Sequence, residues 1–227
     1  IYGPQRVKKS SFVILVPGFS PEGARDKRLV KLAISFAGAG IGVAVPDSDM
    51  IPKRVFSRED IDIIKDTFSF LQEKEYVDPE RIGICGFSVA GSYVLRAASE
   101  LGDAPLFVFS LGGYFDLKEL IAEVLSKRAV YRGFKRPWEP NPLPREVVRN
   151  ILIEYIGKEN AEQLINRNPT FDEAKKYVES LPKELLSSFN NLSPSPVLIN
   201  MRTRVFLMHD KNDDIIPVEE SIKIREA

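Results

Sequence analysis

The sequence contains one cysteine and one histidine among its 227 residues. One cysteine excludes an internal disulfide framework and a cysteine-based zinc site. One histidine excludes a metal centre built from several histidines. The formal net charge is zero, so no strongly basic surface points to nucleic acid as a partner. No apolar run approaches the length of a membrane span, and the 44% hydrophobic content is that of a globular protein with a sizeable core.

Strand-type apolar runs alternate with amphipathic helical patterns in the first half of the chain. This alternation predicts the α/β class, with a doubly wound, mostly parallel sheet and helices on both faces. Ligand sites in such sheets lie at the carboxyl ends of the strands. The predicted strands are Ser11–Val16, Ile41–Val45, Arg81–Gly86, Pro105–Ser110 and Thr203–Met208.

The alternation stops between residues 117 and 197, where no further strand of this type is expected. We interpret 117–197 as a helical cap inserted into a core formed by 1–116 and 198–227. A Pro- and aromatic-rich loop at 134–140 interrupts the cap. Its predicted helices are Leu117–Val130, Arg145–Ile156, Ala161–Ile165 and Phe171–Leu181, the last opened by a capping box at Thr170 and Glu173.

The segment Gly86-Phe87-Ser88-Val89-Ala90 joins a predicted strand directly to a predicted helix. A strand that turns straight into a helix crowds the positions two before and two after the turn, and small residues stand at both. Ser88 is then expected to be strained and exposed at a helix N-terminus, which favours developing negative charge. This pattern is that of a nucleophile elbow. The structural alternative is an ordinary turn with Ser88 as the helix N-cap.

A second polar loop follows the strand that ends at Met208. It contains His209, then the adjacent pair Asp213 and Asp214, and ends at Pro217. The residues alone indicate a solvated turn in which one aspartate caps the last helix. A role as a catalytic acid is implied only by the resemblance described next.

Four segments together make the chain resemble an α/β-hydrolase, most closely the dienelactone-hydrolase-like and esterase-like branches. The resemblance covers nearly all of the chain outside the cap, although Pro17 stands where the family usually has histidine and Asp210 where it usually has glycine. Dienelactone hydrolases themselves carry cysteine at the position of Ser88. The four segments are Leu15–Phe19, Val45–Asp47, Gly86–Gly91 and Met208–Pro217.

The resemblance implies a role for each matching residue. Ser88 would be the nucleophile and Asp213 the acid that orients a catalytic histidine, with Asp214 as the adjacent alternative. The backbone amides of Phe19 and Val89 would form the oxyanion hole. No cofactor or metal is implied.

The catalytic base is the missing part of this assignment. A serine hydroxyl needs a base to take its proton, and His209 precedes the acid, where the family often has a structural histidine. We expect the last strand and the catalytic histidine to lie beyond Ala227, because without that strand an apolar sheet edge would be exposed. The alternative is a natural chain that ends here and is inactive. In either case the 227 residues alone are predicted to have little turnover.

Several other residues have a structural and a functional interpretation. Cys85 lies inside a strand and is expected to be a buried, inert thiol. Asp47 and Asp49 are weak candidates for a metal site. Aromatic residues could line an acyl or leaving-group pocket or pack within the cap: Tyr114 and Trp138 foremost, with Phe115 and Phe134.

These patterns predict a serine hydrolase that cleaves an ester, thioester or amide of a small to medium substrate through an acyl-enzyme. The alternative function is a non-catalytic binding protein that retains the fold. The expected partner is a small-molecule acyl substrate, with no nucleic acid and no membrane span, and with a homodimer left open. We expect a cytoplasmic location.

Overall fold

The computed structural model describes residues 1–3 and 9–227. Its main sheet has five parallel strands in the order β2-β1-β3-β4-β7. The predicted α/β class and parallel sheet are confirmed. The strands are β1 (Ser10–Val16), β2 (Gly42–Ala44), β3 (Val77–Phe87), β4 (Val108–Leu111) and β7 (Val205–Met208).

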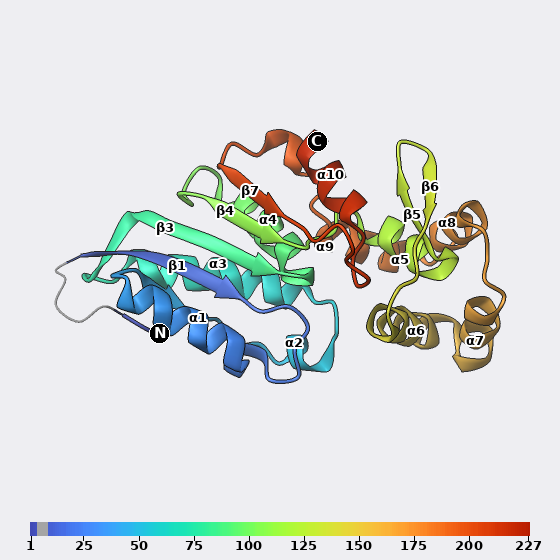
Figure 1. Ribbon diagram of the computed structural model, residues 1–227, viewed down its shortest axis with the longest axis horizontal. Helices are drawn as coiled ribbons and strands as arrows, with labels where there is room; N and C mark the ends of the chain where they lie inside the picture. The colour runs from blue at the N-terminus through green and yellow to red at the C-terminus, as the bar shows by residue number, and fades with distance from the viewer. Residues whose placement is uncertain (4–8) are drawn as a thin grey trace.

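Alternate side chains of β1 pack against helices on opposite faces of the sheet. Val13 and Leu15 pack with Leu29 and Ala33 of α1, whereas Phe12, Ile14 and Val16 belong to the core that contains α3 and α4. Figure 1 shows α1 in front of the sheet, with α3 and α4 behind it. Each helix therefore buries one apolar face against the sheet. Their bounds are α1 (Lys27–Gly38), the short α2 (Met50–Lys53), α3 (Arg58–Gln72) and α4 (Val89–Leu101).

The helical segment between β4 and β7 lies beyond the carboxyl ends of the strands (Figure 1). The predicted capping box is confirmed: Thr170 and Glu173 bond each other's backbone amides at the start of α8. The last helix of this segment, α9, was not predicted, and it packs against α5 as well as α3 and α4 of the core. The helices are α5 (Leu117–Ser126), α6 (Pro142–Ile156), α7 (Lys158–Asn166), α8 (Phe171–Glu179) and α9 (Lys183–Leu192).

The expectation of a helix as far as Val130 and of a loop at 134–140 is wrong for 128–137, which contain two short strands. The first helix ends at Ser126, and its C-cap residue, Lys127, adopts a left-handed conformation with φ 54°. An antiparallel hairpin follows, formed by β5 (Arg128–Tyr131) and β6 (Phe134–Pro137). Its two turn residues, Arg132 and Gly133, both have positive φ, as a tight hairpin turn requires. The glycine was the sequence signal for this turn.

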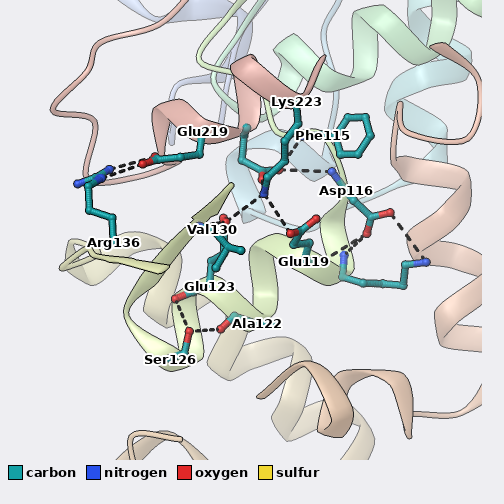
Figure 2. A network of polar contacts seen from close by, with 12 residues as sticks. Phe115, Asp116, Glu119, Ala122, Glu123, Ser126, Val130, Arg136, Glu219 and Lys223 are labelled. Carbon is teal, nitrogen blue, oxygen red and sulfur yellow. Dashed lines mark hydrogen bonds and ion pairs between the residues drawn. The ribbon is translucent and has the colours of Figure 1, made fainter. Parts of the chain in front are cut away.

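A buried ionic network joins this segment to the last helix, α10 (Val218–Glu226). Lys223 Nζ pairs with Glu220 of its own helix and lies 3.1 Å from Glu123 and 3.2 Å from Glu119 of α5. Glu123 and Glu220 are fully buried. Figure 2 shows Lys223 between the two α5 carboxylates, and beside them the bidentate pair of Arg136 with Glu219. Side chains from β6, α5 and α10 are thus held in one cluster.

None of the helices that the structure describes combines the length and the apolar composition needed to cross a membrane.

Candidate active site

The strand–helix turn at Ser88 has the geometry of a strained elbow. Ser88 has φ 54° and ψ −132°, a region that residues with a side chain rarely adopt. Its amide donates to Leu111 O at 2.7 Å, and its carbonyl accepts from the Gly91 amide at 2.7 Å. Its side chain does not cap the following helix, so the N-cap alternative does not describe this residue. A Cβ on Gly86 would lie 2.1 Å from Ala90 O, which is why the turn needs glycine there.

The loop after β1 packs directly against this elbow. A Cβ added to Gly18 would lie 2.8 Å from Ser88 Cβ and 2.7 Å from Phe87 O. Only glycine permits this approach. The next amide, that of Phe19, has no hydrogen-bond acceptor in the described part of the chain. The Val89 amide opens α4, where the first amides of a helix have no intrahelical partner. The two predicted oxyanion donors therefore lie on the two segments that meet at Ser88.

Strand register brings the aspartate loop to the same edge of the sheet. Phe87 pairs with Leu111, and Leu111 pairs with Met208, so the loops that follow these residues are neighbours. A Cβ on Gly112 would lie 3.5 Å from Asp213 Oδ2 and 3.9 Å from Ser88 Cα. Asp213 and Ser88 therefore flank the same glycine.

Asp213 is held in its ionised form by its neighbours. Its Oδ1 accepts hydrogen bonds from the amides of Ile215 at 2.7 Å and Ile216 at 3.0 Å, and its Oδ2 lies 3.4 Å from His209 Nε2. Burial alone would raise the pKa of Asp213, but the His209 contact and the two amides outweigh it and lower that pKa. By contrast, the side chain and carbonyl of Asp214 face Asn141 of the cap segment. Of the two aspartates, Asp213 is the one that lies beside Gly112, the glycine that also borders Ser88.

His209 is engaged at both ring nitrogens. Nδ1 lies 2.6 Å from Ser221 Oγ, and Nε2 lies 2.8 Å from Ile216 O. The ring is buried, with 3% of its side chain exposed. Neither nitrogen is directed at Ser88, which agrees with a structural role for this residue.

Ser88 borders two cavities of different chemistry. The smaller, about 40 Å³, lies beneath α5 and α6 and has an almost wholly apolar lining that includes Phe19, Val89 and Tyr114. The larger, about 390 Å³, lies on the side of α1 and also contains the ion pair of Asp26 with Arg28. The site therefore offers an apolar compartment and a more polar one on either side of the serine.

The two aromatic residues expected in the pocket differ in their placement. Tyr114 lines the smaller cavity, with its hydroxyl turned away to donate to Leu192 O at 2.9 Å. Trp138 is buried but is absent from the linings of the cavities at Ser88. Its indole Nε1 donates to Asp213 O at 2.9 Å, so it contacts the aspartate loop instead. Phe134 is 80% exposed on the hairpin.

Cys85 and Asp47, two other candidate residues from the sequence, lie in environments that favour a structural role. Burial raises the pKa of the Cys85 thiol to about 12, which keeps it protonated and unreactive at neutral pH. Asp47 is near Arg25, at 3.8 Å. Within residues 1–3 and 9–227, no three His, Cys, Asp or Glu side chains are grouped as they would be around a metal ion.

The sequence-based interpretation missed most of the smaller cavity's wall. Leu117, Leu120, Ile121 and Val124 of α5 line it together. Their spacing of three and four residues marked one apolar helix face, and this was the available signal. Nothing in the sequence showed that the face would cover Ser88 rather than another helix.

No model of a known protein family and no curated protein matches the sequence. Solved structures do match it. A 2,6-dihydroxy-pseudo-oxynicotine hydrolase superposes with a TM-score of 0.61 at 17% identity, covering 98% of this chain and 52% of its own. Est1E from Butyrivibrio proteoclasticus gives 0.56 at 15% identity, covering 98% and 76%. An acylaminoacyl peptidase from Pyrococcus horikoshii gives 0.57 at 18%, covering 99% and 31%.

The chain has an α/β-hydrolase fold. This confirms the resemblance inferred from the four sequence segments. The chain spans about half the length of the first of these structures and about a third of the peptidase. Within the α/β-hydrolase fold, Ser88 occupies the elbow between a central strand and the following helix.

Proposed function

We propose that the protein is a serine hydrolase that cleaves a carboxylic ester, thioester or amide through an acyl-enzyme. The observation that carries this proposal is the strained conformation of Ser88, with φ 54°, at a point flanked by Asp213 and by the amides of Phe19 and Val89. Strained residues of this kind are maintained where the surrounding structure over-determines them, most often at active sites. Two of the structural neighbours are named as a hydrolase and an acylaminoacyl peptidase, and these names agree with this chemistry.

In the proposed reaction, Ser88 Oγ attacks the carbonyl carbon as a base removes its proton. The negative charge that develops on the carbonyl oxygen is stabilised by the Phe19 and Val89 amides, each worth about 3 kcal/mol in comparable sites. The protonated base gives its proton to the leaving group, which departs and leaves an acyl group on Ser88. The base then takes a proton from water as the water oxygen attacks the acyl carbon, and it returns that proton to Ser88 Oγ as the acid is released. Residues 117–197 serve as a cap over the apolar cavity, and the larger cavity receives the leaving group.

The base is proposed to come from outside these 227 residues. The chain has one histidine, and both of its ring nitrogens have other partners. Asp213 lies where it could orient an imidazole placed between it and Ser88. The 227 residues alone are therefore expected to turn over esters slowly.

The test is covalent labelling by a fluorophosphonate, with and without added imidazole. Labelling at Ser88 that is accelerated by imidazole in the 227-residue chain, and abolished by Ser88→Ala, supports the hydrolase. The occupied histidine also favours a second candidate, a binding protein that retains the fold without catalysis. Absence of labelling under every condition, including in any longer natural form of the chain, would favour that binding protein and overturn the hydrolase.

A further inference from the structure

The smaller cavity at Ser88 has one polar side-chain group of its own, the serine hydroxyl. Its walls are aliphatic or aromatic, and the Tyr114 hydroxyl is turned away to Leu192. A charged or strongly polar group would lose its water here without gaining a partner. An apolar chain would gain from burial.

A second cavity of about 10 Å³ adjoins the first one between the same two helices. Val124 of α5 and Val148 of α6 line both cavities, whereas Ser88 lines only the first. The two valines are buried, at 4% and 5% exposure. They therefore form the partition between the two spaces.

The chemistry of the lining changes at this partition. Beyond the valines, the second cavity is lined by Leu125 and Ile165 together with Lys127, Arg145 and Asn168. Lys127 Nζ lies 2.9 Å from Glu139, so this end of the cap is ionic. An apolar chain is thus favoured up to the two valines and meets polar groups behind them.

The apolar compartment is small. Its volume of about 40 Å³ has room for about three water molecules, so an unbranched chain of only a few carbons fills it.

We propose that Val124 and Val148 are the specificity-determining residues that set the maximum length of an unbranched, apolar acyl chain bound beside Ser88. This inference rests on the proposed function, because an acyl chain attached to Ser88 is the occupant. Shortening either valine would join the two cavities into one channel through the cap. Enlarging either would shorten the accepted chain.

The test measures binding of straight-chain methyl ketones of four to twelve carbons by calorimetry, all in the Ser88→Ala background. These ligands are neutral and no covalent step can occur, so the result is independent of catalysis. With both valines in place, affinity is expected to rise about fourfold for each added methylene and to stop rising once the chain fills the cavity and reaches Val124 and Val148.

Three valine-to-alanine variants supply the comparison. Val124→Ala and Val148→Ala should move the limit to chains at least two carbons longer. Val147→Ala is the matched control, because Val147 lines the first cavity but not the second, and it should leave the limit unchanged. If either alanine variant fails to fold, Val124→Ile or Val148→Ile should shorten the limit.

An unchanged limit in the folded variants at 124 and 148, an equal shift in Val147→Ala, or no binding of any ketone would overturn the inference. Fluorophosphonate labelling of Ser88 separates this result from the hydrolase proposal. A chain-length limit set by the valines without any labelling would support the binding compartment and contradict only the proposed catalysis.

Discussion

Replacing Lys223 by methionine tests whether the buried ionic network stabilises the packing of α10 against α5. Methionine keeps the length and apolar character of the side chain but removes the ammonium group. That group contacts Glu220, Glu123 at 3.1 Å and Glu119 at 3.2 Å. Glu123 and Glu220 are fully buried, so the substitution leaves two carboxyl groups without their shared cation.

Two independent estimates of the unfolding free energy lost in Lys223→Met agree. Removing one partner of a buried ion pair costs about 3–5 kcal/mol of unfolding free energy. Alternatively, a carboxyl can avoid its charge by remaining protonated. Holding one proton at pH 7 on a group whose ordinary pKa is 4.5 costs about 3.4 kcal/mol, at 1.36 kcal/mol per pH unit. Lys223→Met should therefore lower the stability by about 3–5 kcal/mol at pH 7.

The loss of stability caused by Lys223→Met should depend on pH. Burial already raises the pKa of Glu123 and of Glu220, and the Lys223 ammonium opposes that rise. Without the ammonium, the folded state binds protons still more tightly than the unfolded state. Stability then falls as pH rises above the ordinary carboxyl value, so the difference from wild type should be larger at pH 8 than at pH 5.

The assay is urea unfolding followed by circular dichroism at both pH values. Lys31→Met is the matched control, because Lys31 is exposed on α1 and contacts no carboxylate in the described part of the chain. It should change stability by less than about 0.5 kcal/mol. If Lys223→Met lost no more stability than this control, or lost the same amount at pH 5 and pH 8, the network would not hold the two parts together.

Further outcomes follow from the same structure. Ser88→Gly should be more stable than Ser88→Ala by about 1–3 kcal/mol in urea unfolding, because glycine tolerates the positive φ of this position; equal stabilities would show that the turn is unstrained. Gly18→Ala should abolish imidazole-assisted labelling of Ser88, since its methyl group would lie 2.8 Å from Ser88 Cβ, whereas Gly38→Ala, with no atom within 4 Å, should label normally. Trp138→Phe should lose about 1 kcal/mol of stability with its indole hydrogen bond, and no loss would mean that this contact does not hold the aspartate loop. Burial raises the pKa of Glu123, so wild-type stability should fall between about pH 5 and 8, and Glu123→Gln should reduce that dependence; parallel pH profiles would contradict it.

The elements near Ser88 were predictable because their signals are local. An apolar run, a glycine at 86 and an apolar helical face sufficed to place a strand, a sharp turn and a helix. The aspartate loop was predictable for the same reason, since it directly follows a strand and precedes a proline. Its position beside Ser88 then follows from the parallel register of neighbouring strands.

The cap was predicted less well. Helix α5 was expected to continue to Val130, but it ends at Ser126, and residues 128–131 pair with 134–137 instead. Short segments with mixed polarity carry weak propensities, and packing against neighbours decides between helix and strand. For Trp138, composition indicated an aromatic pocket residue, whereas the fold gave its indole a carbonyl partner 75 residues away.

The sequence by itself determined the α/β alternation, the strand–turn–helix segment at Ser88, the aspartate loop and the presence of a single histidine. These depend on residues that lie within a few positions of one another, and backbone sterics act at that range. Only the tertiary structure decided which aspartate faces Ser88, how Lys223 meets two α5 carboxylates, and where Val124 and Val148 close the apolar cavity. Those features join residues dozens of positions apart, and their contacts exist only once the helices have packed.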